Sequence, residues 1–285
     1  MALTNWTSSA SRGALGLEDI EVGLLLEGIF RRYGFDFREY ARAPLRQRIL
    51  GRVGAEKART VSGLQELLLR DTTAFERFVT AVSAGARSLF SHPESDRSLR
   101  TVLAPALRKR RRLRLWHVGC ATGEGLYSTA VVLREEGLAE KSRVYATDLH
   151  DGPLRQAASG SFPLSRLKDA ENRYHAAGGT ADLRDYYRVA GGRGVFRPDL
   201  RRNVLFAQHN YMTDSSFNEF DVVLCQDLLS DLGHGLQQRV HRLIYDSLAT
   251  GGYLLLRPGE DLRQTACGSR YEAVDVPSGL FRKVM

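Results

Sequence analysis

The chain has 285 residues, of which 43% are hydrophobic, so it can build two modest domains or one large one and is not disordered as a whole. No apolar run approaches the ~18 residues that span a bilayer, which argues against membrane insertion. The net charge of +8 predicts an acidic partner, which would be a nucleic acid, an anionic membrane or an acidic protein face, unless the charge serves solubility alone.

The compartment is indicated by the N-terminus and by the cysteines. The start of the chain lacks the basic and then apolar pattern of a secretory signal, so we expect a disordered lead over residues 1–16. Three cysteines are too few for a disulfide framework and are typical of a reducing compartment. We therefore expect a cytoplasmic protein, and a monomer. No metal is expected, because Cys120 and Cys225 have no nearby histidine or cysteine pair.

Residues 17–107 have the pattern of successive helices. Gly34 is expected to end the first of them. Asp36 and Ser62 each stand three residues before a Glu or Gln, the spacing of a capping box, and Pro44 suits a first helical turn. The apolar face of the first helix is formed by Val22, Leu25, Leu26, Ile29, Phe30 and Tyr33. A further helix is marked by Phe75, Phe78, Val79 and Val82.

The pattern changes at the basic run RKRRRLR, residues 108–114. We expect this run to cap the end of a helix and to form a solvated linker, with phosphate binding as the alternative. After it, strand-like runs alternate with helical ones, notably 125–136 and 234–248, which predicts a parallel sheet with helices on both faces. A C-terminal hairpin predicts one antiparallel edge strand. The candidate strands are LRLWHV, RVYAT, NVLFAQH, FDVVLC, YLLLRP and a final pair around YEAVDV and LFRKV.

A glycine-rich turn, WHVGCATGEGLYS, follows the first of these strands. Glycines let the chain turn sharply into a helix and let a ligand approach the backbone, and the helix N-terminus offers N–H groups to an anion. Asp148, after the second strand, stands where an acid accepts hydrogen bonds from ribose. Glu124 in the turn would repel a pyrophosphate but could pair with an ammonium group. This favours a nucleoside that carries an amino acid, such as S-adenosylmethionine, over NAD.

Five motifs, VGCATGEGLYS, ATDL, FAQHNYM, FDVVLCQDLL and GGYLLLRPGE, resemble in order and spacing those of the chemotaxis receptor methyltransferase family, CheR. The segment YGFDFREYARAPLRQRILGRV is similar to that family's short N-terminal domain. The resemblance implies an α/β, Rossmann-like methyltransferase domain over residues 115–285, with a β insertion near 160–202, which in that family can dock a receptor peptide. It also implies a small all-α domain over residues 17–92 and a linker over 93–114.

The resemblance also implies roles for individual residues. Asp148 and Leu149 would bind the ribose, although Asp148 could instead cap the next helix. Asn210 and Tyr211 would lie beside the adenine, although Asn210 could be a turn residue. The amino-acid part of the cofactor would meet Gly119, Cys120, Ala121, Gly123, Glu124, Asp227 and Leu228. The acidic methylation helix of a receptor-like protein would meet Arg46, Arg48 and Arg52, unless these form an ordinary solvated helix face.

Departures from the family pattern leave the activity open. Ser91 replaces an arginine that contacts the cofactor, and Arg87 could compensate from a different position. Asp231, in place of a tyrosine, should repel a glutamate substrate and could act as a base toward a neutral one. Other changes fall on the same two motifs, where Gly85, Gln226 and Asp227 replace Asn, Arg and Asn.

Three functions follow from these observations. The first is transfer of a methyl group from S-adenosylmethionine to glutamate side chains of a receptor-like protein. The alternative is a sensor or scaffold in a chemosensory-like system, which binds S-adenosylmethionine or S-adenosylhomocysteine and transfers nothing. A nucleic-acid methyltransferase is disfavoured, because the sequence has neither an N-P-P-Y-type motif nor a recognisable RNA-binding module.

Overall fold

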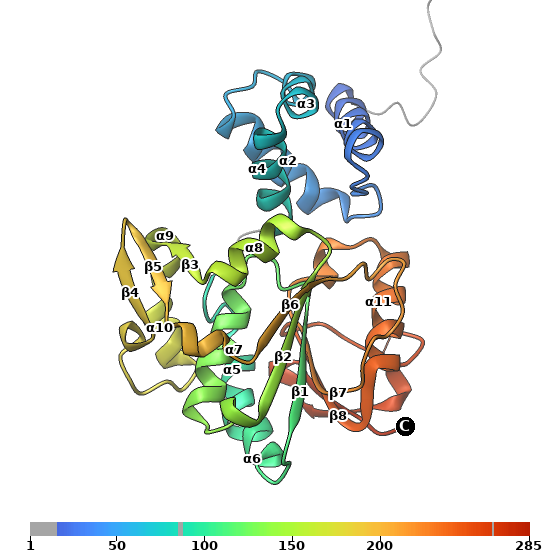
Figure 1. Cartoon of the computed structure of the whole chain (residues 1–285). Coiled ribbons are helices and arrows are strands. Elements are labelled where there is room, and N and C mark those ends of the chain that lie inside the picture. Colours follow the sequence, from blue (N-terminus) through green and yellow to red (C-terminus); the bar gives the residue numbers. More distant parts are fainter. Residues whose placement is uncertain (1–15, 85–87, 264) are drawn as a thin grey trace, which may run out of the picture. The chain divides into compact units, whose positions relative to one another are not determined.

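The computed structural model describes residues 16–84, 88–263 and 265–285 (Figure 1). Contacts within the chain divide it into two units. The first comprises the residues up to Arg38 together with Ala43–Phe78, and the second comprises Glu39–Arg42 and Val79–Met285. No helix in the described residues combines the length and the apolar composition that crossing a bilayer requires.

The first unit is helical. Gly34 adopts a φ of 76° and donates its N–H to the Phe30 carbonyl, so the predicted end of the first helix is confirmed. Tyr33 stacks on Phe75 with 3.8 Å between ring centroids, and the interior is closed by the buried side chains of Leu25, Ile29, Phe37, Ile49, Leu64 and Phe78. The helices are α1 Leu17–Tyr33, α2 Arg42–Ala55, α3 Val61–Arg70 and α4 Thr72–Ala84.

Both predicted capping boxes are wrong. The Thr60 hydroxyl accepts the Gly63 N–H at 3.0 Å and caps α3, whereas the Ser62 hydroxyl donates to Glu21. Asp36 caps no helix, because its carboxylate accepts the N–H of Arg38 in the loop before α2. The sequence spacing alone did not distinguish Thr60 from Ser62, since either hydroxyl can accept a bond from an N–H three residues or fewer ahead.

Thr60→Ala is expected to lower the free energy of unfolding by about 1 kcal/mol, because it removes the cap of α3. Ser62→Ala, which removes only an exposed hydrogen bond, should cost less than about 0.5 kcal/mol. Urea unfolding of both variants measures the difference. A larger loss of unfolding free energy in Ser62→Ala than in Thr60→Ala would support the capping box predicted at Ser62.

The second unit is built on a seven-stranded sheet in the order β6-β2-β1-β7-β8-β10-β9. The strands from β6 to β8 pair in parallel, which confirms the predicted parallel sheet. The expected C-terminal hairpin and antiparallel edge strand are confirmed: β9 forms the edge and pairs antiparallel with β10, which also pairs antiparallel with β8 and lies inside the sheet. The strands are β1 Leu113–Val118, β2 Ser142–Asp148, β6 Val204–Gln208, β7 Phe220–Cys225, β8 Leu248–Leu256, β9 Tyr271–Asp275 and β10 Leu280–Lys283.

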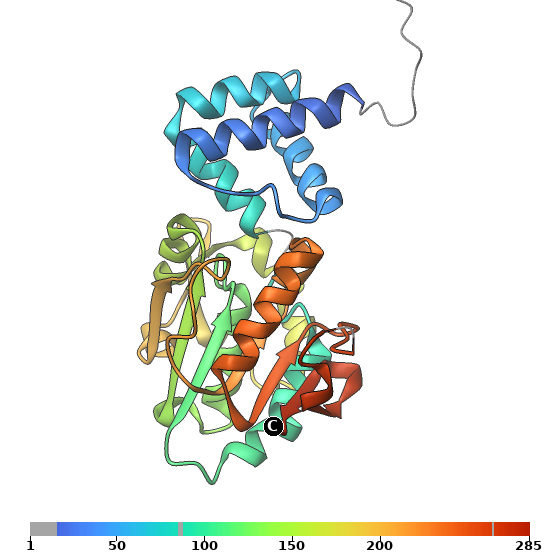
Figure 2. The same ribbon diagram turned by 90° about the vertical axis from the view of Figure 1, so that its right-hand side faces the viewer.

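Helices cover both faces of this sheet. Figure 1 shows α7 and α5 on one side of the strands and α11 on the other, and Figure 2 shows α11 lying across the strands. A π-helical turn, Leu99–Leu103, joins α5 to α6. The helices are α5 Pro93–Ser98, α6 Ala104–Leu107, α7 Glu124–Glu135, α8 Asp151–Ser159 and α11 His234–Ser247.

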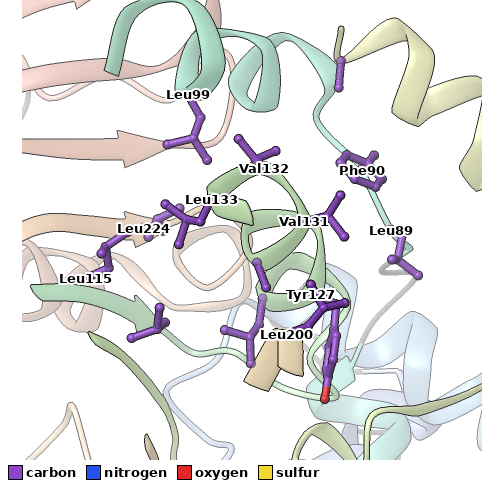
Figure 3. Close-up of a cluster of buried hydrophobic side chains, with 14 of the residues drawn as sticks. Leu89, Phe90, Leu99, Leu115, Tyr127, Val131, Val132, Leu133, Leu200 and Leu224 are labelled. Carbon is purple, nitrogen blue, oxygen red and sulfur yellow. The ribbon is translucent and has the colours of Figure 1, made fainter. Parts of the chain in front are cut away.

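The core lies between α7 and the sheet. Val131, Val132 and Leu133 of α7 are fully or almost fully buried, and Figure 3 shows Leu133 beside Leu115 and Leu224 of the two central strands. Helix α7 therefore has apolar side chains around most of its circumference, as expected for a helix packed on several sides. This packing fixes the position of the glycine turn from which α7 starts.

The expected β insertion is present as a three-stranded antiparallel sheet in the order β3-β5-β4. Gly191 and Gly192 join β4 to β5 with φ values of 55° and 72°, a two-residue turn that glycines favour. The elements of the insertion are β3 Ser161–Pro163, α9 Leu164–Leu167, α10 Ala170–Ala176, the 3-10 turn Leu183–Tyr186, β4 Tyr187–Ala190 and β5 Arg193–Phe196.

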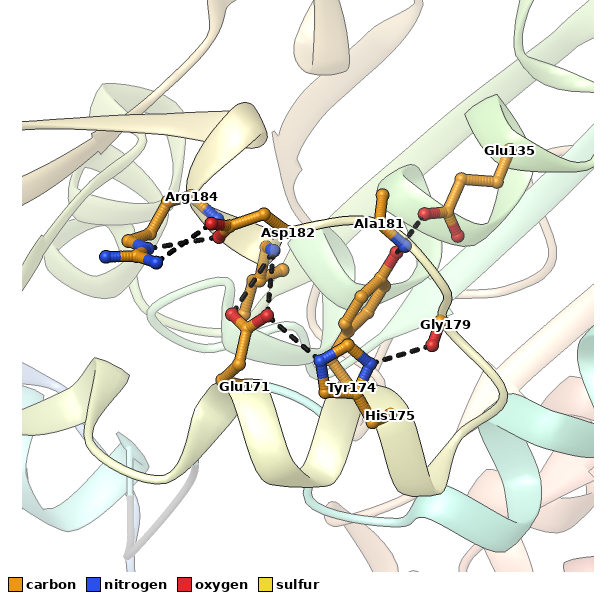
Figure 4. A network of polar contacts seen from close by, with 9 residues as sticks. Glu135, Glu171, Tyr174, His175, Gly179, Ala181, Asp182 and Arg184 are labelled. Carbon is orange, nitrogen blue, oxygen red and sulfur yellow. Dashed lines mark hydrogen bonds and ion pairs between the residues drawn. The ribbon is translucent and has the colours of Figure 1, made fainter.

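A polar network attaches the insertion to the end of α7 (Figure 4). The Glu135 carboxylate accepts the hydroxyls of Tyr174 and Tyr186, and it pairs with Arg100. The Tyr174 hydroxyl in turn accepts the N–H of Ala181 at 3.1 Å. Burial and the Glu135 carboxylate raise the pKa of Tyr174 to about 12, so this hydroxyl stays a donor at neutral pH.

The predicted cap at the basic run is confirmed: Arg108 is the C-cap residue of α6, and the N–H groups of Arg108 and Arg110 donate to the carbonyls of Pro105 and Leu107. Lys141 adds to this cap, because its Nζ donates to the carbonyls of Leu107, Arg108 and Arg110. Within the run, Arg108 pairs with Glu136 and Arg110 pairs with Asp221. The start of the run therefore ends the helix and pairs with carboxylates, whereas Arg111 and Arg112 are exposed, as expected of a solvated linker.

Candidate functional site

The glycine turn between β1 and α7 depends on its glycines. Gly119 and Gly123 have φ values of 63° and 96°, in the left-handed region. A Cβ at Gly119 would lie 3.1 Å from the Cβ of Leu228, and one at Gly123 would lie 2.9 Å from the Cβ of Ala157. Neighbouring elements thus approach this backbone closely. The contact with Leu228 brings the turn together with the segment after β7, as the predicted site requires.

Asp148 ends β2 and is buried, with 6% of its surface exposed. Its Oδ2 accepts the N–H of Ala121 at 2.9 Å, and its Oδ1 accepts the N–H of His150 at 3.0 Å. Ala121 has a φ of 46°, which is uncommon for a residue with a side chain. The Asp148 carboxylate therefore holds the glycine turn in place, and its remaining lone pairs can still accept bonds from a ligand hydroxyl.

Other predicted residues lie at the same edge of the sheet. The Cys120 N–H donates to the Thr147 carbonyl at 2.9 Å, and Gln208 donates its side-chain amide to the Leu149 carbonyl. Cys120 and Leu149 are both buried. They join the carboxyl ends of β1, β2 and β6, which is where open α/β sheets bind their ligands.

Glu124 begins α7 and is almost completely buried, with 1% exposed. The Thr122 hydroxyl donates to its Oε2 at 2.6 Å, and Nη1 of Arg166 lies 3.8 Å from its Oε1. Arg166 belongs to α9 of the insertion and was not predicted from the sequence. The cation beside Glu124 in this structure is thus a guanidinium of the chain itself, at the position where the sequence predicted an ammonium group.

Asn210 and Tyr211 follow β6. The Asn210 side-chain oxygen accepts the N–H of Met212 at 3.0 Å, the geometry of a turn residue. Tyr211 is buried, and its hydroxyl lies 3.0 Å from that of Tyr40. Their predicted place beside an adenine ring stays a prediction.

Asp227 follows β7, and its Oδ1 lies 2.9 Å from Nε2 of His92. Burial raises the pKa of Asp96, one turn after His92, to about 7, and burial likewise raises the pKa of Glu260, after β8, to about 7. The charge of Asp227 adds to both rises, whereas His92 opposes them. We call His92, Asp96, Asp227 and Glu260 the His92 cluster. His92 was missed in the sequence because its partner lies 135 residues away.

The residues that depart from the family pattern mostly contact their own chain. The Ser91 hydroxyl donates to the Ser88 carbonyl and accepts the Ser88 N–H, so it closes a local turn. Asp231 is buried, and its carbonyl accepts the Ala41 N–H. Gln226 is also buried, and its Nε2 has no hydrogen-bond partner in the described part of the chain. Gly85 and Arg87 lie outside the described residues, so compensation by Arg87 stays a prediction.

A hollow of about 450 Å³ lies beside this edge, between the segments that follow β7 and β8. Its lining includes Ser230, His241, Arg257 and Glu260. Among residues 16–84, 88–263 and 265–285, no group of three His, Cys, Asp or Glu side chains is arranged to hold a metal ion. The ionisable residues that line the hollow are the acids Glu260 and Asp261, Arg257 and His241.

The predicted partner-binding arginines lie on α2 of the first unit. Arg46 pairs with Glu18, and Arg52 pairs with Glu56, which also accepts two hydrogen bonds from Arg77. Arg48 is half-buried. Burial, together with the charge of Arg77, lowers the pKa of Arg52. Acidic residues of the same unit thus already neutralise part of this face.

Comparisons with known proteins agree with this geometry. A family model described as "CheR methyltransferase, SAM binding domain" matches residues 87–274, and one described as "CheR methyltransferase, all-alpha domain" matches residues 20–83. A Pseudomonas putida protein named "Putative methyltransferase Cher3" is 36% identical over 265 residues, which cover 93% of this chain and 97% of that protein.

More distant relatives follow. A "Chemotaxis protein methyltransferase" of Listeria monocytogenes is 23% identical over 239 residues, which cover 83% of this chain and 88% of that protein. Among solved structures, a SAM-dependent methyltransferase from Geobacter sulfurreducens in complex with S-adenosyl-L-homocysteine is 17% identical. That match covers 64% of this chain and 54% of the other, with a TM-score of 0.34.

Proposed function

Because the chain belongs to the CheR methyltransferase family, we propose that it methylates glutamate side chains of a receptor-like protein, with S-adenosylmethionine as its cofactor. The observation that carries this proposal is the turn from Gly119 to Glu124, held by the Asp148 carboxylate at the carboxyl ends of two parallel strands. Relatives named chemotaxis protein methyltransferases support the class of substrate.

The residues present fit the cofactor. Asp148 retains lone pairs for ribose hydroxyls, and Glu124 offers a buried carboxylate to a ligand ammonium group beside Arg166. Gln226 offers a buried donor that lacks a partner among the described residues, as a donor awaiting a ligand would. When bound, the cofactor supplies a methyl group on a sulfonium centre, and a carboxylate of the substrate accepts it. The chain's own part is to bind and orient the two reactants.

The helical unit would supply the partner surface. We assign Arg46, Arg48 and Arg52 to the contact with an acidic helix of the receptor, in which the partner's carboxylates would compete with Glu18 and Glu56 for the same guanidinium groups. A cytoplasmic location, a monomeric state and the division into domains at residues 17–92, 93–114 and 115–285 belong to the same proposal.

A second function is favoured by the His92 cluster. Three carboxyl groups near the end of β7 would repel a glutamate side chain, and the arginine that the family pattern has at position 91 is a serine. The charge of Arg257 offsets part of the charge of Glu260, and the charge of Arg100 offsets part of that of Asp96. A chain that binds the cofactor without transferring its methyl group would act as a sensor or scaffold.

Two measurements on the full chain separate these functions. Calorimetric titration with S-adenosylmethionine and S-adenosylhomocysteine should give micromolar binding. Transfer of a labelled methyl group to a receptor cytoplasmic fragment, compared with the same fragment after Glu→Ala substitution at its methylation sites, should give labelling of the unaltered fragment alone. Binding without labelling would support the sensor function. Absence of binding would overturn both functions.

A further inference from the structure

A hollow of about 690 Å³ lies at the opposite end of the sheet from the cofactor site. Leu113, Ser142 and Val204, the first residues of β1, β2 and β6, all line it. Since these strands run parallel, the hollow is at their amino ends, while Gly119 and Asp148 stand at their carboxyl ends. Six residues of β1 separate the two sites by roughly 20 Å. The volume is in the range of small-molecule sites.

The lining of this hollow is strongly basic. It contains six cationic side chains and one carboxylate, that of Glu140. The cations come from three separate segments of the chain, namely the end of the basic run, the start of β2 and the turn before β6. They are Arg111, Arg112, Arg114, Lys141, Arg143 and Arg202. Such a convergence of one sign of charge on a concave site attracts anions.

Several of these cations lack protein partners. Arg111, Arg112 and Arg202 are exposed, and their guanidinium groups form no hydrogen bond or ion pair within residues 16–84, 88–263 and 265–285. Arg114 reaches only the side-chain oxygen of Asn218 at 3.4 Å and the carbonyl of Glu219 at 3.5 Å. By contrast, the preceding basic residues Arg108 and Arg110 are paired with carboxylates. Within the basic run, the guanidinium groups without a carboxylate partner among the described residues are thus those that line the hollow.

The hollow also has an aromatic and apolar side. The Arg143 guanidinium lies over the ring of Tyr145, 5.9 Å from its centroid, and half-buried Val204 and Leu205 lie beside it. Guanidinium groups bind phosphate oxygens in pairs of parallel hydrogen bonds, and an aromatic ring beside them can stack on a flat group. To bind a nucleic-acid backbone, a protein spreads its cations along a face, whereas the cations of this hollow converge on one site.

We propose that this hollow binds a small molecule that carries several phosphate groups. The shared chemistry is a polyphosphate, which a nucleotide or an inorganic polyphosphate would present. This site is separate from the cofactor site and does not depend on methyl transfer. Arg111 and Arg112 would contact the phosphates, and Tyr145 would lie against the base of a nucleotide.

The test is a titration of the full chain with ATP and with inorganic tripolyphosphate, both without magnesium, by calorimetry. Saturating S-adenosylhomocysteine is added first, so that the adenine of ATP cannot report on the cofactor site. If S-adenosylhomocysteine itself does not bind, that result counts against the methyltransferase function and not against the polyphosphate site. At about 50 mM salt we expect micromolar binding, which weakens steeply as salt rises, because the contacts are ionic.

Arg111→Gln/Arg112→Gln is expected to weaken this binding at least about tenfold, since it removes two charge-assisted contacts. Arg59→Gln/Arg188→Gln is the matched control, because both arginines are exposed and lie outside the hollow. Arg202→Gln, on a different segment, provides a second variant if the first does not fold. If ATP binds more tightly than tripolyphosphate and Tyr145→Leu abolishes this difference, the ligand of the hollow is a nucleotide. Equal affinities identify an inorganic polyphosphate.

Three results would overturn the proposal. One is that neither probe binds at concentrations up to about 1 mM, which would mean a binding free energy of less than about 4 kcal/mol. Another is that the double variant binds both probes as the unaltered chain does. The third is that a short DNA duplex binds more tightly than either probe and that Arg111→Gln/Arg112→Gln weakens the binding of the duplex. That result would assign the surface to nucleic acid.

Discussion

Asp148→Ala is expected to weaken the binding of S-adenosylhomocysteine about 100-fold, which corresponds to about 2.8 kcal/mol. The loss has two sources. The carboxylate is the predicted ribose acceptor, and it also accepts the backbone N–H groups of Ala121 and His150. Without it, both buried donors lose their partner, and the left-handed backbone at Ala121 loses the bond that holds it.

Calorimetry measures this loss, and Asp151→Ala is the matched control. Asp151 stands three residues further on, is exposed, and pairs with Arg155 on the outside of α8. We expect its replacement to leave the affinity unchanged. If the affinity of Asp148→Ala for S-adenosylhomocysteine is within about threefold of that of the unaltered chain, a change below about 0.7 kcal/mol, Asp148 does not contribute to the cofactor site.

Asp96→Asn is expected to change the pH dependence of stability by up to about 3 kcal/mol between pH 5 and pH 8. Burial raises the pKa of Asp96 to about 7 in the folded chain, well above its value in the unfolded chain. The folded state therefore holds a proton that the unfolded state has released, and stability falls as the pH rises toward 7. Asparagine carries no charge at either pH, so the variant lacks this part of the fall.

Urea unfolding at the two pH values measures this difference. The charges that face Asp96 are those of His92, Glu94, Arg100 and Asp227, and they stay in place in the variant. Glu94→Gln is the control, because Glu94 is an exposed acid two residues away and should leave the slope unchanged. A slope that Asp96→Asn does not alter would mean that Asp96 is ionised in the folded chain throughout this range.

The sequence predicted the sheet well where strands are buried and continuous. The runs at residues 113–118 and 220–225 coincide with β1 and β7, because central parallel strands are apolar on both faces and end at recognisable turns. Strand β8 was expected from residue 253 but begins at Leu248, since its start, LATGG, carries glycines that weaken the strand pattern. The inner place of β10 has no local signal, because strand order depends on pairing between distant segments.

The candidate site was predictable in the same uneven way. The glycine turn, Asp148 and Leu228 follow motifs within single segments, and the structure brings them together. The partners His92 and Arg166 were missed because they come from segments far from Asp227 and Glu124 in the chain. Lys141 was missed for the same reason, since the helix that it caps ends more than thirty residues earlier. Spacing rules reach one turn of helix or one strand pair, and these contacts lie beyond that reach.

Helix α7 meets the insertion at both of its ends. Its first residue, Glu124, lies beside Arg166 of α9, and its last, Glu135, accepts the hydroxyls of Tyr174 and Tyr186. The hairpin turn at Gly191 and Gly192 takes part in neither contact, and a Cβ at either glycine would meet open space. The insertion thus has a constrained inner side and an unconstrained rim. Over evolutionary time the rim can diversify toward new partners while the inner side keeps the cofactor turn intact.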